Sequence, residues 1–452
     1  MARNRGVDRR AFLRTAGASA LIGAVSARPG IASELASVSD PAESSQQGFD
    51  FDAIYNRVGT DSTKWDGAIA TYGSKIEVGM GIADLDFRTA PCIVQALSKR
   101  MEHENWGYLR QPQRYVDAIV DWNRRRYGLV IDPATITWTS GVHPALIFAL
   151  ETFAPPGTRV LLATPTYNGF YSDLRYTNTL AEDSPMKLVD GRYSIDWEDF
   201  ELRAARSNAF ILCNPQNPTG NCWSPADLTR MGEICLRHKV VVLADEIHCD
   251  FVMKGQKYTP FASLPNRAIV DNSLTFKAAS KTFNLAAMKV AWFFSTNPSL
   301  LARVRARTRA DLTTPGLVAN HAGLTEGEPW LEKLVGYIDG NHDFTESYIA
   351  ERVPYVKYTK AQATYLAWLD VGEVVEKIGA KKTAEEESRR SVTPVTPEDV
   401  VQRWFANNAG VFLSPGAGFG AGGADHMRMN IGTSRKLIER ALGNMAAALK
   451  RA

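Results

Sequence analysis

The segment AFILCNPQNPTG, residues 209–220, places an apolar run directly before a turn. Five consecutive apolar residues are typical of a strand that is buried on both faces of a parallel sheet. The Asn, Pro and Gly residues that follow are the residue types of turns. Similar apolar runs, which alternate with amphipathic stretches, lie at 159–163, 240–244, 274–276 and 290–294. This alternation predicts an α/β fold, with a mainly parallel sheet flanked by helices.

Local signals support this prediction and indicate where a ligand would bind. Ser224 followed by Pro225 is typical of a helix start, and we expect that helix to run to about His238. Polar residues follow the predicted strands closely. They are Tyr167, Asn217, Asp245 and Lys281. In an open α/β sheet ligands bind beyond the carboxyl ends of the strands, so these side chains are expected to share one site.

Three short segments carry the chemistry that pyridoxal 5'-phosphate (PLP) needs, in the order NPQNPTG (214–220), DEIH (245–248) and SKTFNL (280–285). A lysine can hold the cofactor aldehyde covalently, an acid can keep its ring nitrogen protonated, and Asn and His can hydrogen-bond its ring oxygen. Each segment alone has an ordinary alternative, because a single lysine is usually solvated and Asn-Pro-x-Asn-Pro is also a turn. Their combination predicts a PLP site.

From about residue 49 to its end the chain resembles the fold-type I PLP enzymes of the class I/II aminotransferase superfamily. Four phrases are most similar to the cystathionine β-lyase (cysteine C–S lyase) branch: ADLDF (83–87), DEIHCD (245–250), TPFASL (259–264) and SKTFN (280–284). The resemblance implies a large domain with a mainly parallel seven-stranded sheet and a smaller α+β C-terminal domain.

We expect five parts along the chain. They are an export signal at 1–32, a flexible linker at 33–48, an N-terminal arm that joins the small domain at 49–85, the large PLP-binding domain at 86–325 and the small domain at 326–452. In the small domain, 365–369 and 427–431 are predicted strands. The charged, proline-containing stretch 376–397 is predicted to be an exposed insertion.

The resemblance also implies a role for each residue around the cofactor ring. Lys281 would hold the cofactor and move the proton of the substrate Cα. Asp245 would pair with the ring nitrogen, while Asn217 and His248 would hydrogen-bond the ring oxygen. Tyr167 would stack on the ring. Asp245 in a structural salt bridge and Tyr167 as an ordinary core aromatic remain alternatives.

For the cofactor phosphate, the resemblance implies backbone N–H groups at Gly141 and Val142, at the start of a predicted helix. Ser280 and Lys289 belong to the same cofactor-binding set, although Lys289 could equally be a solvated lysine. Tyr108 would reach the phosphate across the interface of a homodimer with shared active sites. Arg428 would bind the substrate carboxylate bidentately.

The N-terminus resembles a twin-arginine export signal, because Arg9 and Arg10 precede Phe12-Leu13 and a weakly apolar segment. A basic disordered tail is the alternative. The first 32 residues carry a net charge of +5, whereas the whole chain carries +3. The remaining residues therefore carry −2. The body of the chain therefore shows no basic surface for nucleic acid. If the signal is genuine, the mature protein is periplasmic or otherwise extracytoplasmic; if it is spurious, the protein is cytoplasmic.

Other classes of protein are disfavoured by composition and spacing. The sequence has no uninterrupted apolar run of about 18 residues, so no membrane span is predicted. The five cysteines have no metal-ligand spacing, and we expect mostly buried thiols. The branch phrases favour β-elimination on an S-substituted L-cysteine, with transamination of an exported metabolite as the alternative. Gly81, where relatives carry a bulky aromatic residue, would widen the pocket if it faces the substrate. A cofactor-binding protein without catalysis is the third hypothesis.

Overall fold

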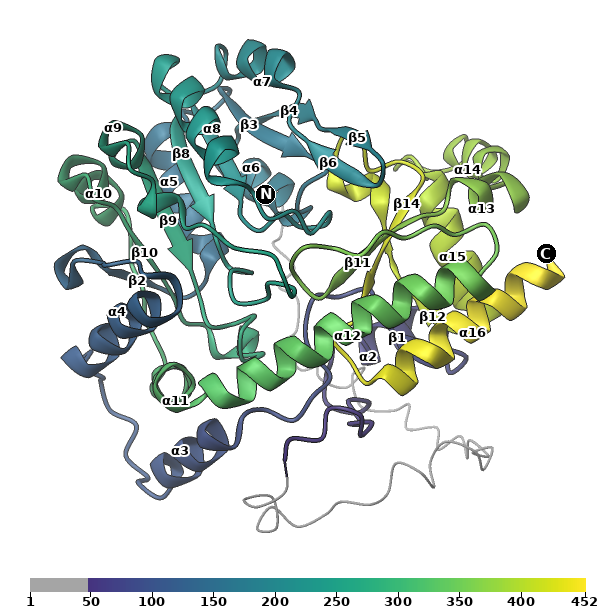
Figure 1. The fold of residues 1–452 in the computed structure, drawn as a ribbon, viewed down its shortest axis with the longest axis horizontal. Coiled ribbons are helices and arrows are strands. Elements are labelled where there is room, and N and C mark those ends of the chain that lie inside the picture. Colours follow the sequence, from purple (N-terminus) through teal and green to yellow (C-terminus); the bar gives the residue numbers. More distant parts are fainter. Residues whose placement is uncertain (1–47) are drawn as a thin grey trace, which may run out of the picture. The chain divides into compact units, whose positions relative to one another are not determined.

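A seven-stranded sheet forms the centre of the structure (Figure 1), a computed structural model that describes residues 48–452. In spatial order its strands are β2 (Thr137–Thr139), β10 (Ala291–Phe294), β9 (Ser273–Lys277), β8 (Val241–Asp245), β7 (Ala209–Cys213), β3 (Arg159–Thr164) and β4 (Leu180–Pro185). All neighbouring pairs from β9 to β4 are parallel, whereas β10 is antiparallel to both β9 and β2. The predicted mainly parallel α/β sheet is confirmed.

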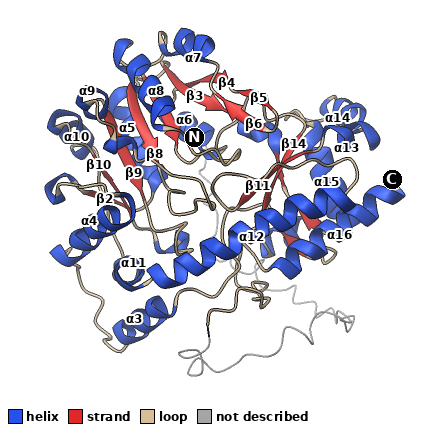
Figure 2. Cartoon of the chain, in the orientation of Figure 1, coloured by secondary structure: helices blue, strands red, loops and turns tan. Residues whose placement is uncertain are grey.

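The central strands lie where the apolar runs predicted them. Every residue of β7 and β9 is buried, which explains why these runs are apolar. Helices cover both faces of the sheet (Figure 2). One face packs against α5 (Val142–Phe153), α6 (Gly169–Thr177) and α10 (Pro298–Arg305). The other packs against α7 (Trp197–Ala204), α8 (Pro225–Arg237) and α9 (Arg267–Asp271). A reciprocal capping box between Ser224 and Asp227 starts α8, as the sequence predicts.

A third apolar cluster joins helices near β2 and β10 to the first part of the chain. Its helices are α3 (Pro91–Met101), α4 (Gln113–Tyr127), α11 (Thr314–Glu326) and α12 (Glu328–Arg352). Phe51, Leu85 and Phe87 are buried in this cluster. The segment that precedes α3 is therefore packed against the helices beside the central sheet.

The C-terminal part contains an antiparallel sheet in the order β11 (Leu366–Asp370), β14 (His426–Asn430) and β13 (Ser414–Pro415). A parallel bridge joins β1 (Val78–Gly79) to β12 (Val411–Phe412), and a hairpin is formed by β5 (Lys187–Val189) and β6 (Arg192–Ser194). The remaining helices are α2 (Asp66–Tyr72), α13 (Gly372–Lys377), α14 (Ala380–Ser388), α15 (Pro397–Ala409) and α16 (Arg435–Arg451). The β1–β12 pairing ties the N-terminal segment to the C-terminal one.

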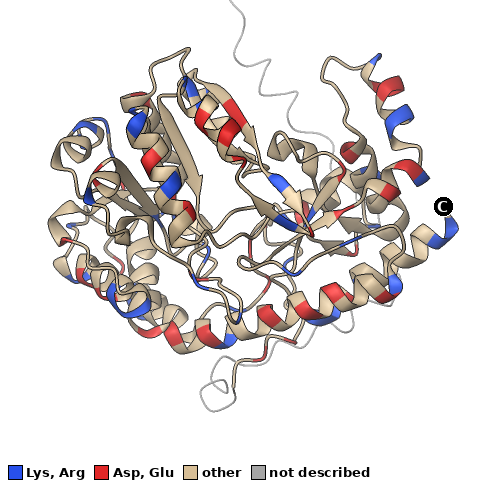
Figure 3. Ribbon diagram, turned by 45° about the horizontal axis from the view of Figure 1, so that its top comes forward, with Lys and Arg blue, Asp and Glu red and all other residues tan. Residues whose placement is uncertain are grey.

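Most residues of the stretch 376–397 are exposed, as predicted, but the stretch also forms a helix that is seated on the core. It contains α14, whose Ala380 and Ala384 are buried in the apolar core of the C-terminal part. Two small apolar residues four positions apart are enough to seat a short helix on a core although the surrounding sequence is charged. Figure 3 shows these charges mostly along the outer faces of helices.

Within residues 48–452, no helix combines the length and the apolar character that a membrane crossing requires. The predicted export signal, with Arg9 and Arg10, and nearly all of the predicted linker lie outside the described residues. All five cysteines are described and are free thiols; Cys213, Cys235 and Cys249 are buried. Three of the five thiols are thus buried, as the sequence predicts.

Candidate active site

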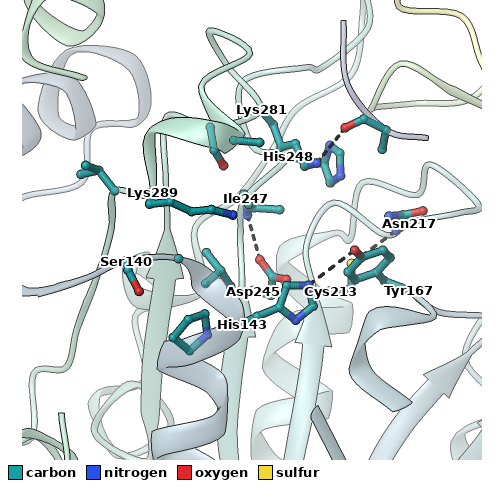
Figure 4. Close-up of a pocket in the computed structure, with 17 residues that line it drawn as sticks. Ser140, His143, Tyr167, Cys213, Asn217, Asp245, Ile247, His248, Lys281 and Lys289 are labelled. Atoms are coloured by element: carbon teal, nitrogen blue, oxygen red, sulfur yellow. Dashed lines mark hydrogen bonds between the residues drawn. The ribbon is translucent and has the colours of Figure 1, made fainter. Parts of the chain in front are cut away.

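A cavity of about 400 Å³ lies beyond the carboxyl ends of β7, β8 and β9. Cys213 and Asp245 end β7 and β8, and Lys281 follows β9 by four residues. Nine of the predicted site residues line the cavity (Figure 4): Gly141, Val142, Tyr167, Asn217, Asp245, His248, Ser280, Lys281 and Lys289. Parallel strands bring these residues together because their carboxyl ends meet at the same edge of the sheet.

Two predicted residues do not line this cavity. Tyr108 lies in the connection between α3 and α4 and is fully exposed, and it does not contribute to this cavity. Arg428 on β14 is buried just outside the lining, where its Nη1 donates to Asn217 Oδ1 at 3.1 Å. Arg428 is therefore connected to the cavity through Asn217.

Lys281 is held by a backbone acceptor rather than by a carboxylate. Its Nζ donates to the carbonyl oxygen of Ala83 at 2.7 Å. Burial lowers the pKa of Lys281 to about 8, and the nearby positive charge of Arg428 contributes in the same direction. A lysine with a lowered pKa is neutral in a larger fraction of molecules at neutral pH, and the neutral amine is the nucleophilic form.

Asp245 is a buried carboxylate without a basic partner. Its Oδ1 accepts from the backbone N–H of Ile247 at 3.1 Å, and it forms no ion pair with Lys, Arg or His in residues 48–452. Burial raises the pKa of Asp245 to about 6. The alternative of a structural salt bridge is therefore not observed in the described part of the chain, and the carboxylate can accept from a cationic group in the cavity.

His248 and Asn217 present donors to the same space. Both are buried, and burial together with the charges of Lys281 and Arg428 lowers the pKa of His248 well below its usual 6.5. The Nδ1 atom of His248 has no hydrogen-bond partner in residues 48–452. Because Asn217 Oδ1 accepts from Arg428, its amide NH₂ group remains available to a ligand.

Arg428 has the properties of a carboxylate-binding residue. Its guanidinium lies over the ring of Phe419 at 4.9 Å and donates from Nη2 to the carbonyl oxygen of Gly81 at 3.1 Å. No described carboxylate pairs with it, and its Nε has no partner in residues 48–452. Burial lowers the pKa of Arg428 to about 10. A buried guanidinium with an unused donor fits an anionic ligand.

The opposite side of the cavity offers backbone N–H groups and one cation. Helix α5 begins at Val142, so the first N–H groups of this helix lie beside Ser140 and Gly141 at the cavity wall. The exposed Lys289, in a left-handed conformation with φ 55°, lines the same cavity. This arrangement fits a phosphate group.

Sequence reasoning missed several contributors to the site. Ala83 contributes only its carbonyl oxygen, for which no side-chain signal exists. Ile247, Ala286 and Val290 line the cavity as apolar residues. His143, which directly follows Val142, also lines the cavity and bonds Asp173. The position of His143 in the first turn of the predicted helix that follows Gly141 was the signal that could have identified this residue.

The predicted extra room at Gly81 is not observed. A Cβ atom at this position would lie 2.5 Å from Cε1 of Phe412, so an aromatic ring from β12 occupies that volume. The volume next to Gly81 is thus filled by a residue more than 300 positions away. Gly81 therefore gives no support to a larger substrate.

Residues 75–445 match the family described as "Aminotransferase class I and II", and the chain belongs to this family. Cystathionine β-lyase PatB of Bacillus subtilis is 36% identical over 409 residues, which cover 88% of this chain and 99% of PatB. The PLP-containing crystal structure of cystalysin from Treponema denticola has a TM-score of 0.81 at 27% identity, covering 90% of this chain and 100% of that one.

A PLP-bound putative aminotransferase from Clostridium difficile 630 is also similar, with a TM-score of 0.80, 30% identity, and coverage of 89% of this chain and 100% of that one. The expected fold-type I architecture is thereby confirmed. The cavity of this chain fits such a cofactor. It is lined by a lysine, an unpaired buried carboxylate, an unpaired buried imidazole nitrogen and a helix N-terminus.

Proposed function

We propose that the protein is a PLP-dependent C–S lyase that acts on an S-substituted L-cysteine and releases a thiol, pyruvate and ammonia. One observation carries the proposal: Lys281, with its lowered pKa, shares a cavity with the unpaired buried carboxylate of Asp245. The 36% identity to a cystathionine β-lyase over almost its whole length supports the reaction type.

The residues of the cavity would hold PLP at both ends. Lys281 would carry its aldehyde carbon, and Asp245 would accept a hydrogen bond from its ring nitrogen. Asn217 and His248 would donate to its ring oxygen, and Tyr167 would cover one face of the ring. When bound, this group supplies an electron sink that stabilises a carbanion at the substrate Cα.

The phosphate would be held at the start of α5. Gly141, Val142 and Ser280 would offer backbone and hydroxyl donors, and Lys289 a positive charge. Lysine supplies a point charge there, in contrast to the bidentate fork of arginine.

Arg428 and Lys281 would act on the substrate itself. Arg428 would bind the α-carboxylate, which orients the Cα–H bond, and Lys281 Nζ would take the Cα proton. The electron pair of that bond would then expel the thiolate and break the Cβ–S bond, and the proton held by Lys281 would pass to the sulfur. Water completes the reaction by replacing nitrogen with oxygen, so one substrate and one water give thiol, pyruvate and ammonia.

Transamination begins with the same loss of the Cα proton, and a similar solved structure is described as a putative aminotransferase. The two reactions are separated by incubating the purified protein with L-cystathionine, S-alkylcysteines and common amino acids, with and without a keto acid. Thiol and pyruvate formed without a keto acid support the lyase. Conversion that requires a keto acid would replace it with an aminotransferase. Inertness towards every amino acid would favour a binding protein without catalysis.

Assembly and location are parts of the same proposal. A homodimer would bring the exposed Tyr108 of one subunit to the phosphate region of its partner, where its hydroxyl group could donate a hydrogen bond. Arg9 and Arg10 would direct the folded, PLP-loaded enzyme to the twin-arginine machinery, and thus to the periplasm or another extracytoplasmic compartment. A lyase suits that location because it needs no second substrate.

A further inference from the structure

His143 and Asp173 form an ion pair at the edge of the cavity that none of the steps above uses. The Nδ1 atom of His143, in the first turn of α5, lies 2.7 Å from Oδ2 and 2.9 Å from Oδ1 of Asp173 on α6. Asp173 is 2% exposed, and His143 is its one ion-pair partner in the described chain. Two helices thus hold the imidazole in one orientation.

The free edge of this imidazole points into the cavity. His143 lines the cavity together with Asp245, and its Nε2 lies 3.4 Å from the hydroxyl oxygen of Tyr167 (Figure 4). The rings of His143 and Tyr167 are 5.5 Å apart. His143 therefore stands next to the two residues that would bind the ring nitrogen and cover the ring face.

Gly169 makes this close packing possible. A Cβ atom at Gly169 would lie 2.5 Å from Cε1 of Tyr167 and 2.6 Å from Cε1 of His143. Contacts this short do not occur between real side chains, so an alanine would force the two rings to move. The first residue of α6 thus leaves space for the His143–Tyr167 arrangement.

We propose that His143 is a positioning residue for the cofactor: with Asp173 behind it, it holds a positive charge beside Asp245 and keeps that carboxylate ionised for a protonated ring nitrogen. This inference rests on the proposed function, since it assigns a partner to the PLP-binding carboxylate. Without a neighbouring cation, a buried carboxylate takes up a proton and loses its attraction for the cationic ring.

The charges around the pair agree with this role. Burial alone would lower the pKa of His143, but the hydrogen bond and negative charge of Asp173 outweigh it and raise that pKa. Other titratable groups also face the pair. Lys281 and Asp245 face His143, and Tyr167 faces Asp173, whereas Cys213 and Arg428 face Tyr167. For Asp245, burial raises the pKa, the charge of His143 lowers it, and the opposing charge of Asp173 has a smaller effect.

The effect of His143 on cofactor binding should depend on pH. In the wild type near pH 6, the raised pKa of His143 favours its charged form, and Asp245, with a pKa of about 6, is about half ionised. Loss of the imidazolium raises the pKa of Asp245, so a larger fraction is protonated near pH 6. Well above both pKa values, Asp245 is ionised with or without His143, and the imidazole of the wild type is neutral. The contribution of His143 to cofactor binding is therefore present at low pH and absent at high pH.

The test measures the dissociation constant of PLP from the apoenzyme, together with the pH titration of the bound-cofactor absorbance, in His143→Gln. Glutamine keeps hydrogen-bonding capacity but not the charge. We expect binding to weaken about tenfold near pH 6 and less than about twofold near pH 8.5. His238→Gln is the matched control, because His238 also pairs with a carboxylate, Glu201 at 3.2 Å, away from the cavity, and it should bind like the wild type.

The double variant His143→Gln/Asp173→Asn leaves no uncompensated buried charge, and it should show a smaller loss with the same pH dependence. Equal weakening at both pH values, or no change in either variant, would overturn the inference and show that the pair only supports the helices. Failure of the wild-type apoenzyme to bind PLP would overturn the proposed function, and this inference with it.

Discussion

The ammonium group of Lys281 donates a hydrogen bond to the carbonyl oxygen of Ala83, 198 residues earlier in the chain. Ala83 lies in a segment held on both sides. Tyr365 donates from its hydroxyl group to the same carbonyl at 3.0 Å, and the neighbouring Asp84 and Asp86 pair with the buried Lys64. The N-terminal segment thus forms part of the wall around the lysine. Lys281 reaches into the cavity from a loop and is aimed by backbone from another part of the fold.

Lys281→Ala should abolish turnover and covalent cofactor attachment while leaving the fold intact, because it removes the amine that carries the cofactor. Borohydride reduction of the wild-type holoenzyme followed by peptide mass spectrometry should label Lys281 only. Lys277 is the internal control: it is also buried, but its ammonium group is bound to Asn123 Oδ1 at 2.8 Å, away from the cavity. An active Lys281→Ala enzyme, or label on Lys277, would contradict the proposed site.

Asp245→Asn should stabilise the apoenzyme near neutral pH. Burial raises the pKa of Asp245 from 3.8 to about 6, so this carboxylate favours folding less as pH rises from about 4 to about 6. Asparagine removes that penalty, by on the order of 2–3 kcal/mol at pH 7 and almost none at pH 4. Thermal unfolding of both apoproteins at the two pH values measures the difference.

With PLP present, the wild type should be more stable than Asp245→Asn, because asparagine no longer attracts the protonated ring nitrogen. We expect weaker cofactor retention and turnover reduced by several orders of magnitude, since the electron sink depends on that proton. Near-normal rates with tight cofactor binding would show that Asp245 has a structural role instead.

Arg428→Lys should lower kcat/KM by about 10- to 100-fold, because an ammonium group cannot reproduce two parallel hydrogen bonds to a carboxylate. The loss should vanish for an amine analogue that lacks the carboxylate. Arg435→Lys is the control, since Arg435 bonds Asn341 at 3.2 Å and lies over Tyr337, and its replacement should leave kcat/KM unchanged. Equal losses for both types of substrate would exclude carboxylate binding by Arg428.

Tyr108→Phe should weaken PLP binding in a dimer that remains intact, because the variant removes a hydroxyl group that would reach the partner's phosphate region. Sedimentation velocity gives the assembly state and apoenzyme titration gives the affinity. A fully active monomer would rule out shared active sites.

Replacing Arg9 and Arg10 with lysine should retain an active, PLP-loaded enzyme in the cytoplasm, because the twin-arginine machinery reads the arginine pair. Fractionation and N-terminal sequencing of the wild type should find a mature protein that begins near residue 28 or 33. A cytoplasmic wild type that begins at Met1 or Ala2 would show that the signal is spurious.

Most of the central sheet was predictable because buried parallel strands are coded locally. The runs 159–163 and 209–213 became β3 and β7 almost without change of boundary. The helix α14 within the exposed stretch 376–397 was not, because a charged helix seated by only two alanines, Ala380 and Ala384, has a weak local signal.

The sequence by itself was enough to predict that Asp245 and Lys281 share one site, because both follow predicted strands and the strand ends of a parallel sheet converge. Only the tertiary structure decided what surrounds them. Phe412 fills the space at Gly81, Ala83 aims Lys281, and Asp173 orients His143. Periodicity reports which face of an element is buried. It does not report which distant residue packs there, since that depends on how the layers fit together.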